Sequence, residues 1–389
     1  MTTSQDAAAA PTATGLNVRI TDVEAIYLRL PDFDEARTDS SRDALIIRVS
    51  TDAGVTGYGE VDSSPLVVKA IIESPASHTI ARGLRELLIG RDPLEVERLW
   101  HDMYEATLYV GRSGVVIHAM AGVDIALWDL KGKLLGLPVH NLLGGAHRTE
   151  IRAYASNMFQ LTPEATADRA AAAVAAGYTA VKFGWEPFGA DPQSDEAFVR
   201  AIRERVGDDV DIAIDAGLAW DTKTAIQRVR LLEQYRLLWL EEPLHPDNLR
   251  GYRRLTQAVD TPIAAGEEEC TRDGFRRLMD EGGVDIVQID VTRVGLTQSM
   301  LIAGDAQQRG VPVANHTFTT DLNASASLHF LAAIPNALIC EYCVEPGELS
   351  RTLLTSPVRL IDGMAQVPQG PGLGVELDTE VMDRFLWRG

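Results

Sequence analysis

The sequence predicts an α/β protein built as a (β/α)8 barrel with a smaller α+β domain before it. From about residue 150, eight short apolar runs alternate with helical stretches, the rhythm of parallel strands joined by helices. Nearly every run ends in an ionisable or polar side chain, as expected where a barrel builds its site at the carboxyl ends of its strands. A length of 389 residues leaves room for both domains.

The segment before the barrel is expected to form the smaller domain. Residues 1–16 lack a basic start and a long apolar run, which indicates a floppy tail rather than a signal peptide. Residues 17–60 alternate like strands around an Asp-Ala-Gly turn signal, and residues 66–136 carry apolar side chains at helical spacing. We therefore predict an α+β domain over residues 17–145.

The barrel itself is predicted over residues 146–360. Its strands are expected in the runs EIRAYAS, YTAVKF, VDIAIDAG, LLWLEEP, TPIAAGEE, VDIVQID, VPVANHT and ALICEY. Helical stretches such as TADRAAAAVAAG and DEAFVRAIRERVG separate them. The closing Gly/Pro-rich segment VPQGPGLGVELD predicts that residues 361–389 return to the first domain.

Composition narrows the function classes. A formal net charge of −20 argues against nucleic acid and against a stable anionic-membrane surface. An acidic ligand would therefore need a metal or a few local cations. Cys340 and Cys343 form a Cys-x-x-Cys pair without the second pair that a zinc site requires. With no run long enough to span a bilayer, we expect a cytoplasmic protein that acts on a small molecule.

Three acids end successive strands. Asp215, Glu241 and Glu267 are separated by equal steps of 26 residues, from 215 to 241 and from 241 to 267. Each step is one strand–helix unit, so the carboxylates should be neighbours at the barrel mouth. Clustered carboxylates repel one another unless they are protonated or share a cation. A hard, oxygen-liganded ion such as Mg²⁺ is therefore predicted here.

The other strand ends supply a base and a cation. Asp290 precedes His316 by one strand–helix unit, and an aspartate that accepts one imidazole N–H raises the basicity of the other nitrogen. Removing a proton next to a carboxylate needs such a base. Lys182, in AVKFGWEP, is a surface lysine, a base or a clamp for an anionic substrate. Trp185 either lines the pocket or covers the barrel mouth.

The sequence resembles the enolase superfamily, in its mandelate racemase/muconate lactonising branch. The motifs that carry the resemblance are GVDIALWDLKGKLLGLPVHNLLGG, WLEEPL, QIDVTRVGLTQ and PGLG. It implies a modified barrel covered by an α+β capping domain made from both chain ends. It also implies metal ligation by Asp215, Glu241 and Glu267. Two positions depart from the family pattern, Gly217 where Asn is frequent and Glu268 where a small or amide residue is frequent.

The resemblance also assigns the remaining site residues. It implies that His316 and Asp290 form a catalytic dyad and that Glu341 hydrogen-bonds the substrate carboxylate opposite the metal. Racemases of this branch carry Lys-x-Lys on the second strand, whereas this chain keeps Lys182 and has Gly184 at the second position. A single base is therefore expected, with Glu186 as the alternative second one.

These features predict a Mg²⁺-dependent acid-sugar dehydratase. Lys182 would clamp the substrate carboxylate, and His316 would take the proton from carbon 2. Loss of the 3-hydroxyl as water would give a 2-keto-3-deoxy acid. A racemase, epimerase or cycloisomerase is the alternative, and a catalytically silent metal-binding member is the third possibility. A homo-oligomer is expected, and specificity should reside in the loops at residues 31–43 and 60–66.

Overall fold

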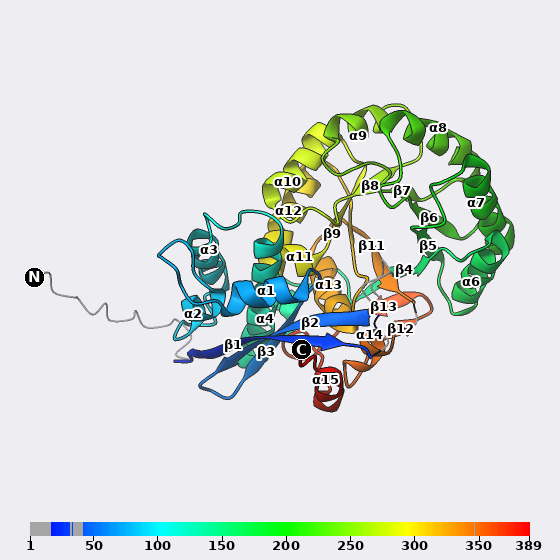
Figure 1. Cartoon of the computed structure of the whole chain (residues 1–389). Helices are drawn as coiled ribbons and strands as arrows, with labels where there is room; N and C mark the ends of the chain where they lie inside the picture. Colours follow the sequence, from blue (N-terminus) through cyan, green and yellow to red (C-terminus); the bar gives the residue numbers. More distant parts are fainter. Residues whose placement is uncertain (1–16, 32, 34–41, 346) are drawn as a thin grey trace, which may run out of the picture.

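A closed barrel and a separate antiparallel sheet confirm the predicted fold class. The computed structural model describes residues 17–31, 33, 42–345 and 347–389 (Figure 1). The predicted tail 1–16 and most of the loop 31–43 lie outside the described residues. In Figure 1 the capping domain, drawn in blue and cyan, lies beside the ring of green and yellow barrel helices.

The capping domain is a three-stranded antiparallel sheet with helices. Its strands β1 (Ile20–Arg29), β2 (Asp43–Thr51) and β3 (Thr56–Val61) pair in chain order. Its helices are α1 (Pro65–Glu73), α2 (Leu84–Leu88), α3 (Val96–Ala106), α4 (Val115–Leu135) and α5 (Val139–Leu142). Helix α4 lies directly on β3, because a Cβ atom at Gly59 would sit 2.1 Å from the Gly122 carbonyl oxygen. The glycine in the strand therefore permits backbone-to-backbone contact.

Helix α4 contains the motif GVDIALWDLKGK and joins the two domains. Asp124 accepts hydrogen bonds from the backbone N–H (2.9 Å) and the hydroxyl (2.5 Å) of Thr297, in the barrel. Asp129 accepts from the N–H of Tyr58 (2.9 Å) and of Leu373 (2.8 Å), and it pairs with Lys133 at 2.8 Å. The two motif aspartates thus connect the capping sheet, the barrel and the PGLG segment.

Eight parallel strands form the barrel. They are β4 (Glu150–Met158), β5 (Ala180–Gly184), β6 (Asp211–Asp215), β7 (Trp239–Glu241), β8 (Ile263–Ala265), β9 (Ile286–Ile289), β10 (Val313–Asn315) and β11 (Ala337–Cys343). Each strand pairs with the next in chain order, and β11 pairs with β4 through Cys340 and Ala153, which closes the barrel. Each of the eight strands overlaps one of the apolar runs in which the sequence predicted a strand.

Two aromatic side chains fill one layer of the barrel interior. Tyr154 on β4 and Trp239 on β7 are fully buried, and their rings meet edge to face with centroids 5.3 Å apart. The rest of this layer is small or aliphatic, formed by Ala180, Ala213, Ala264, Ile286, Ala314 and Ile339. Alanines on the facing strands leave the volume that two large rings need.

Helices surround the barrel (Figure 1). They are α6 (Pro163–Ala175), α7 (Pro192–Val206), α8 (Thr222–Leu232), α9 (Leu249–Thr256), α10 (Arg272–Arg277), α11 (Val291–Val294), α12 (Leu296–Gln308), α13 (Asp321–Ala333) and α14 (Glu348–Thr352), with a 3₁₀ turn η2 (Glu233–Tyr235) and a π turn η3 (Leu278–Gly282). Capping side chains start several of them, such as Asp191, which accepts from the Ser194 N–H at 2.8 Å. Within the described ranges, no helix is long and apolar enough to cross a membrane.

The C-terminal segment runs from the barrel to the capping domain. A short hairpin, β12 (Leu360–Ile361) and β13 (Met364–Gln366), adds antiparallel to β4. Helix α15 (Thr379–Phe385) then lies near β1, and the Trp387 N–H donates to the Tyr27 carbonyl at 2.9 Å. In Figure 1 the red end of the chain accordingly lies beside the blue strands. The predicted boundary at residue 361 stays a prediction.

Candidate active site

A cavity of about 230 Å³ lies where the barrel strands end. Its walls come from the ends of β4, β5, β6, β8, β9 and β10 and from the segment after β3 of the capping domain. The lining residues are Asp62, Ser156, Asn157, Met158, Lys182, Gly184, Trp185, Asp215, Glu267, Glu268, Arg293, His316 and Phe318. Most of the side chains predicted at strand ends therefore meet in one place.

Lys182 lies buried between two carboxylates. Its Nζ atom is 2.5 Å from Oε1 of Glu241 and 2.8 Å from Oε1 of Glu341. Burial by itself would lower the pKa of this lysine, but the charges of the two glutamates outweigh burial and raise the pKa well above its usual value. The two glutamates therefore favour the charged form of Lys182, and its burial excludes the interpretation as an exposed surface lysine.

Glu341, the second partner of Lys182, is fully buried. Ser156 donates its hydroxyl proton to Oε1 at 2.7 Å, and the Thr317 N–H donates to Oε2 at 2.7 Å. Burial opposes its charge, but Lys182 and His316 overcome that effect and hold the pKa of Glu341 below its usual range. The hydrogen bond that the resemblance implied between Glu341 and the substrate carboxylate stays a prediction. In the structure Glu341 is a partner of Lys182.

The three predicted metal ligands occupy adjacent strand ends. Asp215 and Glu241 face each other in the register of β6 and β7, and Glu267 follows β8. Asp215 and Glu267 line the cavity, whereas Glu241 is fully buried, with Lys182 on Oε1 and the Trp239 indole N–H on Oε2 at 2.9 Å. Burial, followed by the charge of Glu241, raises the pKa of Asp215 well above its usual value.

This acidic cluster fits a hard divalent cation. Two further acids, the buried Glu242 and the half-buried Glu268, adjoin the predicted ligands. Burial and neighbouring carboxylates raise the pKa of Glu242 well above its usual value and that of Glu268 to about 7. Oxygen donors crowded out of water in this way favour protonation or a bound cation. The donor set is all carboxylate, as Mg²⁺ or a similar ion prefers.

His316 and Asp290 form the predicted pair. The Nδ1 atom of His316 lies 2.8 Å from Oδ2 of Asp290, while Oδ1 of Asp290 accepts from the N–H and the hydroxyl of Thr292. Nε2 is left facing the predicted metal ligand Glu267, with 3.5 Å between Nε2 and Oε2. Burial would lower the pKa of His316, but Glu267 and Asp290 raise it to about 10. A cation bound by Glu267 would cancel much of that charge.

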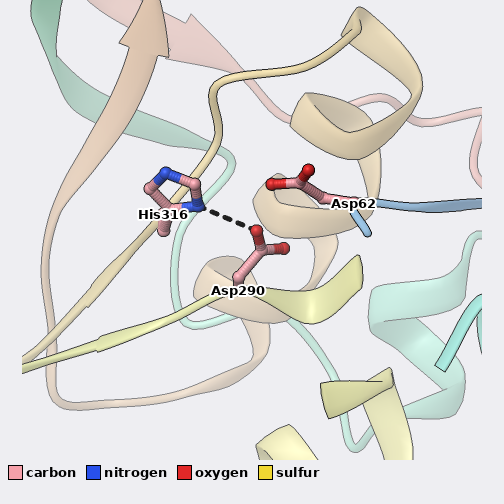
Figure 2. A group of neighbouring side chains, drawn as sticks. All are labelled: Asp62, Asp290 and His316. Atoms are coloured by element: carbon pink, nitrogen blue, oxygen red, sulfur yellow. Dashed lines mark hydrogen bonds and ion pairs between the residues drawn. The ribbon is translucent and has the colours of Figure 1, made fainter. Parts of the chain in front are cut away.

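A capping-domain acid completes this corner of the cavity. Figure 2 shows Asp62 directed toward Asp290 and His316, and ligand atoms of the three lie within 4.8 Å of one another. The spacing could hold a metal ion, but Arg293 already provides a cation, with Nη2 donating to Asp62 at 2.9 Å and Nε lying 3.9 Å from Asp290. His316 also directs Nδ1 to Asp290. Asp62, Asp290 and Arg293 are therefore better suited to orient His316 as a base than to bind a metal ion.

The loop after β5 explains one departure from the family pattern. Trp185 has a positive φ of 67° and its ring lies over Gly217, where a Cβ atom would be 3.2 Å from the indole Cδ2. Gly217, itself at φ +55°, therefore leaves room for the ring, which a larger residue would crowd. Trp185 lines the cavity, whereas Glu186 is exposed and is absent from the described lining residues.

Several residues of this site were missed in the sequence, among them Ser156, Arg293, Asp62 and Trp239. Ser156 ends the first barrel run and could have been found by extending the strand-end rule to EIRAYAS. Arg293 lies inside the motif QIDVTRVGLTQ, and Asp62 lies in the loop predicted to carry specificity. Trp239 begins the motif WLEEPL, but the motif did not indicate its contact with Glu241, which is an interaction inside the barrel.

Two family models match the chain. The model described as Mandelate racemase / muconate lactonizing enzyme, N-terminal domain, matches residues 18–144, and the Enolase C-terminal domain-like model matches residues 165–381. The chain belongs to the mandelate racemase/muconate lactonizing enzyme family. It is therefore an enzyme of the enolase superfamily, whose members bind a divalent metal, as the resemblance implied.

Relatives in this family carry several names. D-xylonate dehydratase of Haloferax volcanii is 32% identical over 92% of this chain and 89% of its own length. D-galactarolactone cycloisomerase of Agrobacterium fabrum is 30% identical over 88% of this chain and 90% of its own length. The crystal structure of the 3,6-anhydro-D-galactonate cycloisomerase from Zobellia galactanivorans is 32% identical, with a TM-score of 0.86, and covers 95% of this chain and 100% of that one.

Proposed function

We propose that this enzyme is a Mg²⁺-dependent acid-sugar dehydratase, a hydro-lyase. The observation that carries the proposal is one oriented base, His316, opposite a buried cation, Lys182, in a cavity lined by carboxylates. The dehydratase names of several relatives at about 30% identity support the same reaction class. Asp215, Glu241 and Glu267 would hold the metal, which supplies a Lewis acid for the substrate carboxylate.

The protein side chains divide the remaining work. Lys182 binds the substrate carboxylate and keeps its charge because Glu341 and Glu241 face it. Nε2 of His316 takes the proton from carbon 2, while Asp290 fixes the tautomer through Nδ1. The pair of electrons left on carbon 2 then forms the double bond to carbon 3.

Elimination follows from the same groups. The carbon 3–oxygen bond breaks as that double bond forms, and the protonated His316 returns its proton to the leaving hydroxyl, which departs as water. The resulting enol tautomerises to a 2-keto-3-deoxy acid. Lys182, as a fixed cation, stabilises negative charge that develops on the carboxylate oxygens during proton removal.

The single base favours elimination over racemisation. A racemase needs a second base on the opposite face of carbon 2, and Gly184 stands at the position of the family's second lysine. Glu186, the alternative second base, is exposed rather than in the cavity wall. Among the lining residues, His316 thus serves as the base, and Lys182 serves as a cation.

A cycloisomerase is the second candidate, because two relatives carry that name. A ring oxygen on carbon 3 would leave by the same route as a hydroxyl. The two reactions differ in whether water is released, so the substrate decides between them.

The test is a screen of aldonates, uronates and aldarates, with lactones and anhydro acids added, in the presence of Mg²⁺. We expect at least one acid to yield a 2-keto-3-deoxy product, detected as its semicarbazone. His316→Asn should remove measurable turnover, since general acid–base action contributes about 10²–10⁴-fold. Full activity in that variant, or deuterium exchange at carbon 2 without loss of oxygen, would overturn the assignment as a dehydratase.

A further inference from the structure

Trp239, in the aromatic layer of the barrel interior, contacts the predicted metal ligand Glu241. Trp239 and Glu241 are two residues apart on β7, so their side chains lie on the same face of the strand. Both are fully buried, and the indole N–H of Trp239 donates to Oε2 of Glu241 at 2.9 Å. This is a charge-assisted hydrogen bond in a place without solvent, where such bonds are strong.

The two oxygens of Glu241 have different partners. Oε1 faces the ammonium of Lys182 at 2.5 Å, and Oε2 faces the indole of Trp239. The ammonium of Lys182 is shared with Glu341 and lines the cavity. The ring of Trp239 is held in place, because Tyr154 and the surrounding barrel layer enclose it. The rigid partner therefore fixes one oxygen and leaves the other on the side of the lysine.

We propose that Trp239 is a positioning residue for metal binding: by fixing Oε2 of Glu241, its N–H holds the carboxylate in the orientation in which it would meet the metal. The inference rests on the proposed function of Glu241 as a ligand. The terminal torsion of a glutamate is broad and would otherwise let the carboxylate turn. Partners that orient metal ligands in this way typically contribute about 10–100-fold to metal affinity.

The test compares two buried tryptophans. Trp239→Phe removes the N–H donor at Glu241, and Trp128→Phe removes a similar donor on α4, where the indole donates to the Thr297 hydroxyl at 2.9 Å. Isothermal titration of the substrate-free proteins with Mg²⁺ measures affinity without any turnover. We expect Trp239→Phe to bind Mg²⁺ about 10–100-fold more weakly, and Trp128→Phe to bind as the unmodified protein does.

A second variant distinguishes loss of the N–H donor from a change in the size and shape of the ring. Replacing Trp239 by benzothienylalanine, through amber suppression, exchanges the N–H for sulfur at nearly the same volume. This variant should also lose Mg²⁺ affinity while keeping the circular dichroism and melting temperature of the unmodified protein. Unchanged affinity in it would overturn the positioning role. Absence of Mg²⁺ binding by the unmodified protein would instead overturn the proposed function.

Discussion

Gly184 shows how one residue restricts the chemistry of this site. A Cβ atom at this position would lie 2.7 Å from Oδ2 and 2.9 Å from Cβ of Asp215. In this arrangement the aspartate occupies the space that a side chain at 184 would need. The sequence revealed that the second lysine was missing, but only the structure gives a steric reason why a longer side chain does not fit beside this conformation of Asp215.

Gly184→Ala should therefore impair the enzyme although it adds one methyl group. The side chain of Asp215 would have to shift, and a misplacement of about 1 Å in a catalytic arrangement can cost roughly 10²-fold in rate. We expect a loss of that order in kcat/KM together with weaker Mg²⁺ binding. Gly304→Ala is the matched control, because a Cβ atom there meets nothing within 4 Å. Equal rates for the two variants would contradict the steric explanation.

The positions of site residues were predictable where a residue ends a strand. How deeply each side chain is buried was less predictable. The equal spacing of Asp215, Glu241 and Glu267 brought them to neighbouring strands, as the register shows for the first two. Alternation along a strand tells which face a side chain takes but not how far from the cavity it ends. Glu241 and Glu341 are therefore buried below the cavity surface, which no sequence pattern indicated.

Among the elements, α4 carries the most recognisable motif for a structural reason. Asp129 satisfies two backbone N–H groups, of Tyr58 and Leu373, from segments more than 300 residues apart in the chain, and it neutralises Lys133. Its burial raises its pKa, while Lys133 and the hydrogen bonds oppose that rise. The motif aspartate therefore links the capping sheet and the C-terminal segment to helix α4.

Asp129→Ala should destabilise the protein by about 3 kcal/mol, because removal of one partner of a buried ion pair leaves a charge and two N–H groups unpaired. Urea unfolding followed by circular dichroism measures this loss. Arg98→Ala on α3 removes an exposed ion pair with Glu95 and should stay within about 0.5 kcal/mol of the unmodified protein. A similar small change in Asp129→Ala would show that the contacts contribute little.

The elements were predictable in proportion to their periodicity. Each barrel strand overlaps a predicted apolar run, and α6 and α7 overlap the two helical stretches quoted from the sequence. The hairpin β12–β13 was not expected, because strands of two and three residues are too short to show alternation. Its pairing with β4 depends on a neighbour more than 200 residues earlier in the chain.

At the scale of the whole molecule, contacts between distant segments hold the domains together. Glu60 on β3 accepts from the Thr320 hydroxyl at 2.6 Å and from the Asn323 N–H at 3.0 Å, at the start of α13. Burial raises the pKa of Glu60 to about 7. The sequence contains no local signal for such a contact, since its partners are 260 residues apart.

A buried histidine pair adds a pH dependence to stability. His329 donates from Nε2 to the Leu373 carbonyl at 3.0 Å, so its Nδ1 accepts from His140, whose Nδ1 lies 3.0 Å away. Burial lowers the pKa of His329 to about 3. An unfolded histidine takes a proton below about pH 6.5, whereas the folded one does not until far lower. The unfolded state therefore gains protons first, and stability should fall as pH falls below 6.5.

His329 should lower the free energy of unfolding by about 2 kcal/mol as the pH falls from 6.5 to 5. Each pH unit in this window contributes about 1.4 kcal/mol for one titrating group. Urea unfolding at pH 7.5 and pH 5 should show a smaller difference for His329→Gln than for the unmodified protein. His245→Gln, which replaces an exposed histidine, should leave the difference unchanged. Identical pH dependence in all three proteins would contradict the role of the pair.

The contact between Trp387 and Tyr27 has a consequence for how the protein is made. The backbone of β1 is synthesised before the barrel, whereas the Trp387 N–H that donates to it follows the barrel in the chain. This contact therefore cannot form until all eight barrel strands have been translated. The barrel strands, by contrast, emerge in the order in which they pair. The capping domain is thus begun before the barrel and completed after it.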